Sequence, residues 1–433
     1  MKYYSTNKQA PVASLQEAVV KGLAADKGLF MPMSIKPLPQ DFYDTIDSLS
    51  FQEIAYRVAD AFFGEDIPAD TLKQIVYDTL SFDVPLVKVA DNIYSLELFH
   101  GPTLAFKDVG GRFMARLLGY FIKKEGQKNV NVLVATSGDT GSAVANGFLG
   151  VEGIHVYVLY PKGKVSEIQE KQFTTLGQNI TALEVDGTFD DCQALVKSAF
   201  MDKELNEHLS LTSANSINVA RFLPQAFYYF YAYAQLKRAG KADNAVICVP
   251  SGNFGNITAG LFGKKMGLPV KRFIAANNRN DIFYQYLQTG KYNPRPSVAT
   301  IANAMDVGDP SNFARVLDLY SGSHADISAE ISGTTYTDEQ IRETVKETWK
   351  EHHYLLDPHG ACGYRALVEG LKEGETGVFL ETAHPAKFLE TVESIIGEAV
   401  EIPAKLQEFM KGEKKSLQMT KEFADFKKYL LTL

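Results

Sequence analysis

The chain has 433 residues, 45% of them hydrophobic, and its 44 basic and 52 acidic side chains give a formal net charge of -8. This composition excludes disorder as the main state and argues against nucleic-acid binding, which usually needs a basic domain or stripe, although it permits an anionic small-molecule ligand. Because no apolar run approaches the roughly 20 residues of a membrane span, no signal peptide opens the chain and the three cysteines form no disulfide or zinc pattern, we expect a cytoplasmic protein without a membrane partner.

The first hundred residues are predicted to be mostly helical, with prolines at the turns. Apolar residues recur at helical spacing over Phe51 to Phe63 and again over Ala69 to Leu80. The stretch from Val84 to Leu98 is instead typical of two short strands that are joined by a turn at Asp91-Asn92.

From about Asn129 the chain alternates between short apolar strands, polar loops and helices. Strands are predicted at residues 130–135, 156–160, 245–249 and 378–380. Their nearly continuous apolar character is typical of parallel strands that are buried on both faces, and the alternation predicts an α/β protein. Since ligands collect at the carboxyl ends of such strands, we expect the functional residues in the loops that follow them.

One of these loops, Gly252–Asn256, lies between a predicted strand and a helix that starts near Ile257. Backbone amides at a helix N-terminus bind anions, and glycine lets the backbone approach a ligand closely. The loop matches neither the Walker A motif nor the Gly-x-Gly-x-x-Gly fingerprint. On spacing alone it is interpreted either as a phosphate site or as an ordinary turn.

A second loop, Ser137–Gly141, has the same placement and offers hydroxyl and amide donors. It could hold a carboxylate or a phosphate. Asp139 could equally be a helix N-cap, the commonest role of Asp at such a position.

Lys107 stands beside apolar residues just before a helix predicted at Gly111 to Lys123. A desolvated lysine has a lowered pKa and can form a Schiff base. The alternative is a surface ion pair with Asp108 or Asp139.

Two further features are interpreted as structural. His100, His359 and His384 lack metal-ligand spacing, so no metal site is predicted, and His384 is expected to cap the helix that Pro385 opens. Residues 404–433 carry seven lysines and four acids, and a solvated helical face is favoured there over a site for an anionic partner.

Taken together, these stretches resemble threonine synthase, a pyridoxal 5'-phosphate (PLP) enzyme of the tryptophan-synthase β fold type, in its long form. The matching segments, in order, are Lys21–Ala24, Asp26–Phe30, Gly101–Asp108, Thr136–Gly141, Pro161–Val165, Ser213–Asn218, Gly252–Asn256 and Thr382–Phe388. Each segment is only moderately specific, whereas their order and spacing are highly specific.

The resemblance implies PLP fold type II: two parallel-sheet α/β lobes with the cofactor between them, plus a mainly helical N-terminal domain. It predicts an N-terminal domain at residues 1–97, a large PLP-binding domain at 98–127 and 223–403, a small mobile substrate domain at 128–222, and a C-terminal tail at 404–433 that packs on the core. We expect a monomer or a homodimer.

The resemblance also assigns the cofactor site. Lys107 looks like the lysine that carries PLP and then serves as general base, and Thr382 resembles the residue that faces the pyridine nitrogen. The loop for the cofactor phosphate corresponds to Gly252, Asn253, Phe254, Gly255 and Asn256. Asp139 stands where many relatives of the fold carry Asn near the phenolic oxygen of the cofactor, so two anions would repel each other there unless one is protonated.

Two groups of residues resemble the substrate site. The substrate carboxylate is expected to bind Thr136, Ser137 and Thr140. The substrate phosphate is expected to bind Asn215, Ser216 and Arg221, with Lys162 and Asn218 as weaker candidates. Arginine suits bidentate phosphate contacts, and without the neighbouring Asn-Ser pair we would interpret Arg221 as an ordinary ion-pair partner on the aromatic helix Phe222 to Leu236.

The implied activity is conversion of O-phospho-L-homoserine and water into L-threonine and phosphate, the last step of threonine biosynthesis, by PLP-dependent γ-elimination and β-hydration. One alternative is another lyase of this fold, such as a threonine dehydratase or a cysteine synthase, which would not need Asn215, Ser216 and Arg221. A catalytically silent regulator that binds PLP or phosphate is a second alternative, and the presence of Lys107 and both loops argues against it.

Overall fold

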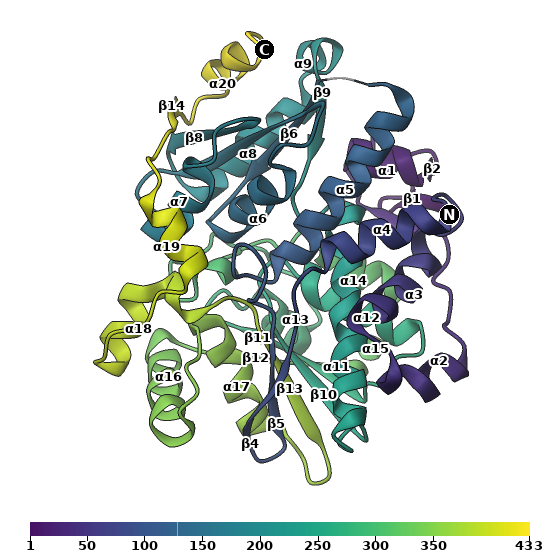
Figure 1. Cartoon of the computed structure of the whole chain (residues 1–433), viewed down its shortest axis with the longest axis vertical. Helices are drawn as coiled ribbons and strands as arrows, with labels where there is room; N and C mark the ends of the chain where they lie inside the picture. The colour runs from purple at the N-terminus through teal and green to yellow at the C-terminus, as the bar shows by residue number, and fades with distance from the viewer. Residues whose placement is uncertain (128) are drawn as a thin grey trace.

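The structure is a computed structural model that describes residues 1–127 and 129–433. The described chain contains three sheets, and Figure 1 shows the two larger ones as separate lobes, one around β6, β8 and β9 at the top and the other around β10 to β13 below. The predicted boundary at residue 128 lies outside the described residues.

The N-terminal region combines helices with a small antiparallel sheet of order β2-β1-β3. Its elements are β1 (Lys2–Ser5), β2 (Ala13–Ser14), α1 (Leu15–Lys21), β3 (Phe30–Pro32), α2 (Gln40–Thr45), η1 (Ile46–Ser48), α3 (Phe51–Phe63) and α4 (Ala69–Thr79). The helices predicted at 51–63 and 69–80 are confirmed, and the Ser50 hydroxyl caps α3 by accepting from the Glu53 amide. The sheet was not predicted, because strands this short carry too little periodicity to be recognised.

Aromatic side chains pack this region against the rest of the chain. The ring of Phe51 stacks on Tyr231 with 4.5 Å between centroids, and Phe63 lies 5.1 Å from Phe113. Phe113 belongs to α5 (Lys107–Glu125), the helix that begins with the candidate catalytic lysine. The N-terminal region therefore packs directly on the helix that carries Lys107.

The large lobe holds a six-stranded sheet of order β12-β11-β10-β13-β5-β4, parallel except for the β4–β5 pair. Its strands are β4 (Leu86–Ala90), β5 (Ile93–Glu97), β10 (Ala245–Pro250), β11 (Arg272–Asn277), β12 (Ile331–Thr335) and β13 (Thr376–Glu381). The predicted hairpin is confirmed, with Asn92 in the left-handed region at φ 59°. Both hairpin strands fall inside residues 1–97, so the large sheet begins within the segment expected to form the N-terminal domain.

Helices cover both faces of this sheet. The helices in this part of the chain are α11 (Ala226–Arg238), α12 (Gly255–Lys265), α13 (Ile282–Thr289), η3 (Asn303–Met305), α14 (Phe313–Leu319), α15 (His324–Glu330), α16 (Asp338–His352), α17 (Pro358–Gly370), η4 (Pro385–Phe388) and α18 (Leu389–Ile396). The His384 ring nitrogen Nδ1 accepts from the Ala386 amide, so its predicted role as a cap is confirmed for η4.

The small lobe holds a five-stranded, wholly parallel sheet of order β14-β8-β7-β6-β9. Its elements are β6 (Val130–Ala135), α6 (Asp139–Phe148), β7 (Ile154–Pro161), α7 (Glu167–Thr174), β8 (Ile180–Asp186), α8 (Phe189–Met201), α9 (Lys203–His208) and β9 (Ser210–Ser213). The short segments α10 (Val219–Phe222) and η2 (Leu223–Gln225) return the chain to α11 in the large lobe.

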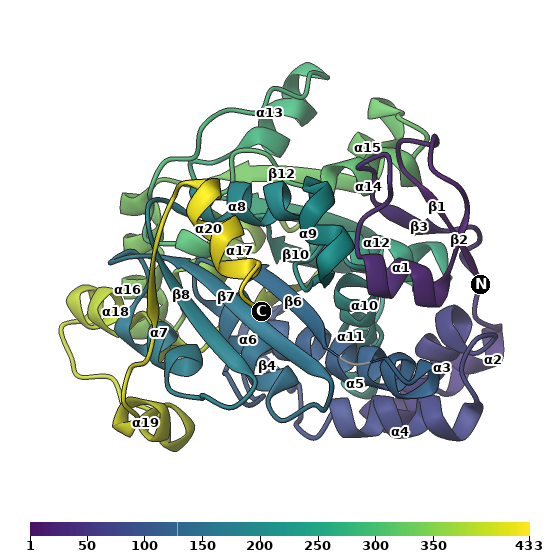
Figure 2. The same cartoon turned by 90° about the horizontal axis from the view of Figure 1, so that it is seen from above.

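The C-terminal tail completes the small lobe. It comprises α19 (Ala404–Lys411), β14 (Leu417–Thr420) and α20 (Phe423–Leu430), and Figure 2 shows it in yellow along the outer side of that lobe. Lys414 pairs with Glu184 at 2.5 Å, and Lys427 pairs with Asp202 at 2.9 Å. These two lysines bind acids of the small lobe, so the prediction of a freely solvated basic face is wrong for them.

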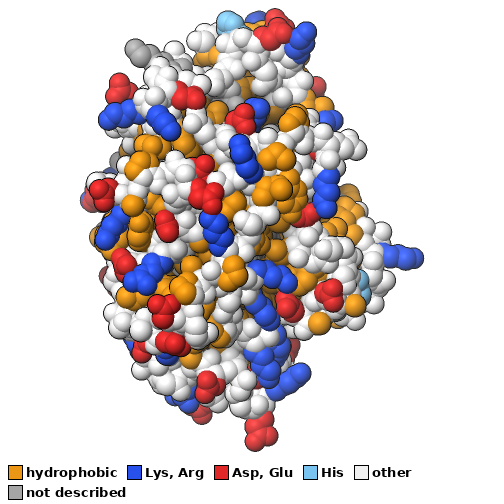
Figure 3. Space-filling model, turned by 90° about the vertical axis from the view of Figure 1, so that its right-hand side faces the viewer, with side chains coloured by type: hydrophobic (Ala, Val, Ile, Leu, Met, Phe, Trp, Pro, Cys, Tyr) orange, Lys and Arg blue, Asp and Glu red, His pale blue; other side chains and the backbone are white. Residues whose placement is uncertain are grey.

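On the face shown in Figure 3, acidic and basic side chains are intermingled and hydrophobic side chains are scattered. Within the described ranges, no helix is both long and apolar enough to cross a bilayer.

Candidate active site

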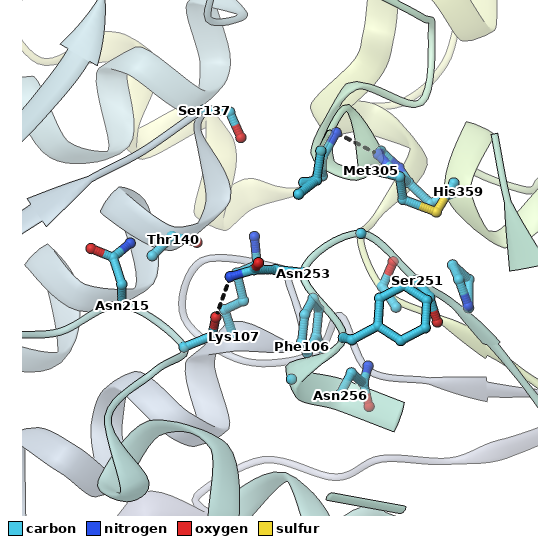
Figure 4. A pocket seen from close by; sticks show the side chains of 18 of the residues that line it. Phe106, Lys107, Ser137, Thr140, Asn215, Ser251, Asn253, Asn256, Met305 and His359 are labelled. Atoms are coloured by element: carbon cyan, nitrogen blue, oxygen red, sulfur yellow. Dashed lines mark hydrogen bonds between the residues drawn. The ribbon is translucent and has the colours of Figure 1, made fainter. Parts of the chain in front are cut away.

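A cavity lies between the lobes, where the loops after β6, β9, β10 and β13 meet. It is lined by the predicted residues Lys107, Ser137, Thr140, Asn215, Ser216, Arg221, Gly252, Asn253, Phe254, Gly255, Asn256 and Thr382. In Figure 4, Thr140 and Asn215 lie on one side of Lys107, whereas Ser251 and Asn256 lie on the other. The fold thus brings together all predicted site residues except Thr136 and Asp139.

Lys107 is the first residue of α5, four positions before the predicted start of that helix. Burial, together with the charges of Arg221 and Lys387, lowers the pKa of Lys107 to about 8, although Asp139 opposes this effect. A fraction of such an amine is neutral near pH 7, as a nucleophile or a general base requires.

The predicted alternative of a surface ion pair for Lys107 is wrong. The buried Asp108 carboxylate accepts from the Thr103 amide at 2.9 Å and from the Thr103 hydroxyl at 2.6 Å. Asp139 is also buried and pairs with Lys387.

The loop after β10 has the geometry of an anion cradle. Phe254 caps α12 at φ 66°, a conformation that side chains other than glycine rarely adopt. A Cβ at Gly252 would lie 2.7 Å from the Ala304 carbonyl oxygen, so only glycine fits against the opposite wall. The first amides of α12 have no acceptor within their helix and are available to a ligand.

Asn256, in the first turn of α12, contributes a further donor. Its Oδ1 accepts from the hydroxyls of Tyr228 and Tyr229, each at 2.7 Å, which orients the amide group. The buried Nδ2 has no acceptor among the described residues. Buried donors without an acceptor are rare in proteins, so this atom fits an anionic ligand such as the cofactor phosphate.

The wall that contains Thr382 is backed by buried acids. Burial and the neighbouring charge of Asp357 raise the pKa of Glu381 well above its usual range. Thr382 follows Glu381 and lines the cavity. Its side chain is uncharged, and a hydroxyl can donate a hydrogen bond to an unprotonated pyridine nitrogen.

Sequence reasoning missed part of this cavity wall. Asn303, Ala304, Met305, Asp306 and Val307 line it together with Ser251, Gln225, Phe189, Gln193 and His359. His359 holds the 303–307 segment in place, since its Nε2 accepts from the Ala304 amide at 3.1 Å and its Nδ1 lies 2.5 Å from Asp357. The 303–307 segment carries no motif, so only its tertiary position reveals it.

Some residues of the loop after β6 line the cavity, and others hold the conformation of the loop. Ser137 and Thr140 line the cavity, whereas the Thr136 Oγ1 accepts from the amides of Gly138 at 2.9 Å and Gly141 at 2.8 Å. Thr136 therefore shapes the loop. Gly138 is the N-cap of α6 at φ 142° and Asp139 is the first helical residue, so the alternative that Asp139 is the cap is wrong.

The Asp139 carboxylate lies behind the cavity wall. It accepts from the Lys387 Nζ at 2.6 Å and from the Gln169 Nε2 at 3.0 Å. Burial by itself raises the pKa of Asp139, but Lys387 and Lys107 lower it to about 2, so the carboxylate is ionised. Lys387 stands in the Thr382–Phe388 segment, yet nothing in the sequence pairs it with Asp139.

Arg221 is a buried cation without a carboxylate partner in the described structure. Its Nη1 donates to the Ala214 carbonyl, while its Nε has no acceptor. Burial lowers the pKa of Arg221 to about 10, which leaves the guanidinium charged at neutral pH. The alternative of an ordinary ion pair is therefore wrong, and the geometry favours an anionic ligand.

Hydrogen bonds from neighbouring segments hold the segment Ser213–Asn218 in position. Ser216 accepts through Oγ from the Asn253 Nδ2 at 2.7 Å, which joins this segment to the loop after β10 (Figure 4). Arg315 donates to the Phe30 carbonyl at 3.0 Å and to the Ile217 carbonyl at 2.6 Å, which ties the segment to the N-terminal region.

The two weaker candidates do not line the cavity. Asn218 is buried, and its Nδ2 donates to the carbonyls of Val19 at 2.9 Å and Ser213 at 3.1 Å, which leaves no free donor for a ligand. Lys162 is exposed on the surface. Neither residue therefore has the position in this structure that substrate contact requires.

Known proteins match the chain over its whole length. The family model of pyridoxal-phosphate dependent enzymes matches residues 84–382, that of the threonine synthase N terminus residues 2–80, and that of the threonine synthase C-terminal region residues 360–430. Threonine synthase from Serratia marcescens is 45% identical over 435 residues, which cover 100% of both chains.

Two solved structures have the same fold. The crystal structure of threonine synthase from Escherichia coli matches with a TM-score of 0.94 at 44% identity over 100% of both chains. PLP-bound threonine synthase from Brucella melitensis matches with a TM-score of 0.92 at 36% identity over 99% of this chain and 98% of the other. The predicted fold and cofactor are confirmed, and this chain belongs to the threonine synthase family of pyridoxal-phosphate-dependent enzymes.

Proposed function

We propose that this chain converts O-phospho-L-homoserine and water into L-threonine and phosphate. The observation that carries the proposal is that two groups of anion-binding residues line the same cavity as one lysine. The loop at 252–256 offers amides and the Asn256 Nδ2, whereas the second site holds the buried guanidinium of Arg221. A phosphorylated substrate and a phosphorylated cofactor together supply the two anions.

The second anion site supports this substrate over the alternatives. A buried charge without a partner costs several kcal/mol, so an enzyme for a substrate without phosphate gains nothing from Arg221. Threonine dehydratase and cysteine synthase act on such substrates. A silent regulator would not need a lysine that is suited to proton transfer, whereas burial lowers the pKa of Lys107 to about 8.

The residues around the cavity have different roles in the proposed reaction. Lys107 holds the cofactor, which when bound supplies an electron sink for the substrate carbanion. The freed Lys107 amine takes the proton from the substrate α-carbon. Ser137 and Thr140 bind the substrate carboxylate, and Asn215, Ser216 and Arg221 bind the phosphate until it leaves the γ-carbon.

Water enters the reaction only after phosphate has left. We propose that the small lobe, residues 128–222 in the predicted division, closes over the substrate and excludes water until the β-carbon is ready for hydration. The ion-paired C-terminal tail would move with this lobe, because β14 belongs to its sheet.

The proposal is tested with purified protein. We expect a visible absorbance band of lysine-bound PLP, borohydride fixation of the cofactor at Lys107, and equal release of phosphate and threonine from O-phosphohomoserine. Lys107→Ala should abolish turnover. Release of ammonia without phosphate would support a dehydratase instead, and threonine formation by the Lys107→Ala variant would refute the role of this lysine.

We also propose a cytoplasmic location and a monomeric or homodimeric state. The location is supported by Cys192, Cys248 and Cys362, which are free and buried. Light scattering on the purified protein distinguishes the two states.

A further inference from the structure

One buried ion pair joins the two lobes beside the cavity. Asp139 begins α6 in the small lobe, and Lys387 belongs to η4, which follows the last strand of the large sheet. The Lys387 Nζ lies 2.6 Å from the Asp139 Oδ1, and the two side chains are only 0% and 4% exposed. Water therefore screens this pair far less than it screens a surface pair.

Both partners contact segments that build the active site. The Lys387 Nζ also donates to the Thr103 carbonyl at 2.8 Å, in the segment that leads to Lys107. Asp139 stands between Ser137 and Thr140, which line the cavity. The pair thus links the proposed carboxylate-binding loop to the segment that carries the catalytic lysine.

Three charged side chains act on the Lys107 amine. The Asp139 carboxylate raises the pKa of Lys107, whereas the Arg221 guanidinium and the Lys387 ammonium lower it. Within the pair the two effects oppose each other, so Arg221 contributes the uncompensated charge. The pair also explains how an ionised aspartate is tolerated beside an anionic cofactor, because Lys387 neutralises it.

We propose that Asp139 and Lys387 form a positioning unit, which fixes the Ser137–Thr140 loop against the Thr103–Lys107 segment and in which the charge of each partner cancels that of the other beside the Lys107 amine. This inference rests on the proposed role of Lys107 as the lysine that carries the cofactor. Neither Asp139 nor Lys387 needs to touch the substrate.

Two single variants and the double variant test the proposal through the visible spectrum of the holoenzyme, without turnover. In Lys387→Met the remaining carboxylate favours the protonated lysine–PLP linkage, so the midpoint of its spectroscopic pH titration rises by about one unit or more. In Asp139→Asn the remaining ammonium lowers the midpoint by a similar amount. The Asp139→Asn/Lys387→Met variant returns the midpoint to within a few tenths of a unit of wild type.

A second ion pair in the large lobe provides the matched control. The Arg272 Nη2 lies 2.7 Å from the Oε2 of the buried Glu375, and neither residue lines the cavity. Arg272→Met and Glu375→Gln should lower the melting temperature and leave the titration midpoint unchanged.

The outcomes separate this inference from the proposed function. Midpoints that move in the same direction in both single variants, or that agree in all variants, overturn the proposal. If the single variants do not fold, a shifted midpoint in the double variant, which buries no lone charge, overturns it as well. Borohydride fixation at a lysine other than Lys107 would instead show that the proposed function has failed.

Discussion

Replacing Arg221 by methionine tests whether this arginine binds a ligand or only stabilises the structure. The guanidinium is buried, its Nε has no acceptor, and no carboxylate pairs with it in the described structure. Removing one partner of a buried ion pair destabilises a protein by about 3–5 kcal/mol, because a lone charge is left behind. Arg221→Met leaves no such charge and deprives only the Ala214 carbonyl of a donor, so we expect its melting temperature to fall much less than that of a variant that breaks a buried pair.

The loss should appear in substrate binding instead. A charge-assisted hydrogen bond is worth about 1.5–3 kcal/mol, so one or two contacts between Arg221 and the substrate phosphate correspond to about 3 kcal/mol. This amounts to a decrease of roughly 150-fold in kcat/KM for O-phosphohomoserine. The assay measures phosphate release over a range of substrate concentrations, together with thermal unfolding of both proteins.

Arg315 offers a matched control. It is also a buried arginine, and burial lowers its pKa to about 9, but it does not line the cavity and it donates to the carbonyls of Phe30, Ser216 and Ile217. Arg315→Met should lower the melting temperature because these carbonyls lose their donor. If Arg221→Met destabilises the protein as Arg315→Met does and leaves kcat/KM within about threefold of wild type, Arg221 is structural and the reasoning is refuted.

Two further predictions follow from the cofactor site. Asn256→Asp keeps an acceptor for Tyr228 and Tyr229 but replaces the Nδ2 donor by an anionic oxygen, so PLP affinity, measured as cofactor retained after dialysis, should fall at least about tenfold; unchanged retention would contradict a phosphate at this site. Because folding lowers the pKa of Lys107 from 10.5 to about 8, the unfolded apoprotein binds more protons between these values, and stability should rise with pH across this window. Urea unfolding should therefore show Lys107→Met apoprotein to be more stable than wild type at pH 7, with a difference that shrinks above about pH 8; a difference independent of pH would count against the lowered pKa.

Local periodicity and composition were sufficient to predict most of the helices and strands. The helix Phe51–Phe63 and the strand Val130–Ala135 appear at the predicted residues, because apolar spacing reports directly which face of a segment is buried. The three-stranded N-terminal sheet escaped prediction, since its short strands depend on pairing between Tyr3 and residues far along the chain. The ion pairs of the tail were not predicted for a similar reason. Its lysines pair with acids of the small lobe that are distant in the sequence, and only the fold brings them together.

The sequence by itself identified Lys107, the loop at Gly252–Asn256 and Arg221, because the order and spacing of their segments resemble threonine synthase. Residue types alone left an alternative for each of them. The sequence left Asp139 with an unresolved repulsion and gave Lys387 no role. Only the tertiary structure decided that these two charges pair across the lobes at 2.6 Å. The physical reason is that a buried charge is governed by whichever partner the fold brings within a few ångströms, and no local pattern records that partner.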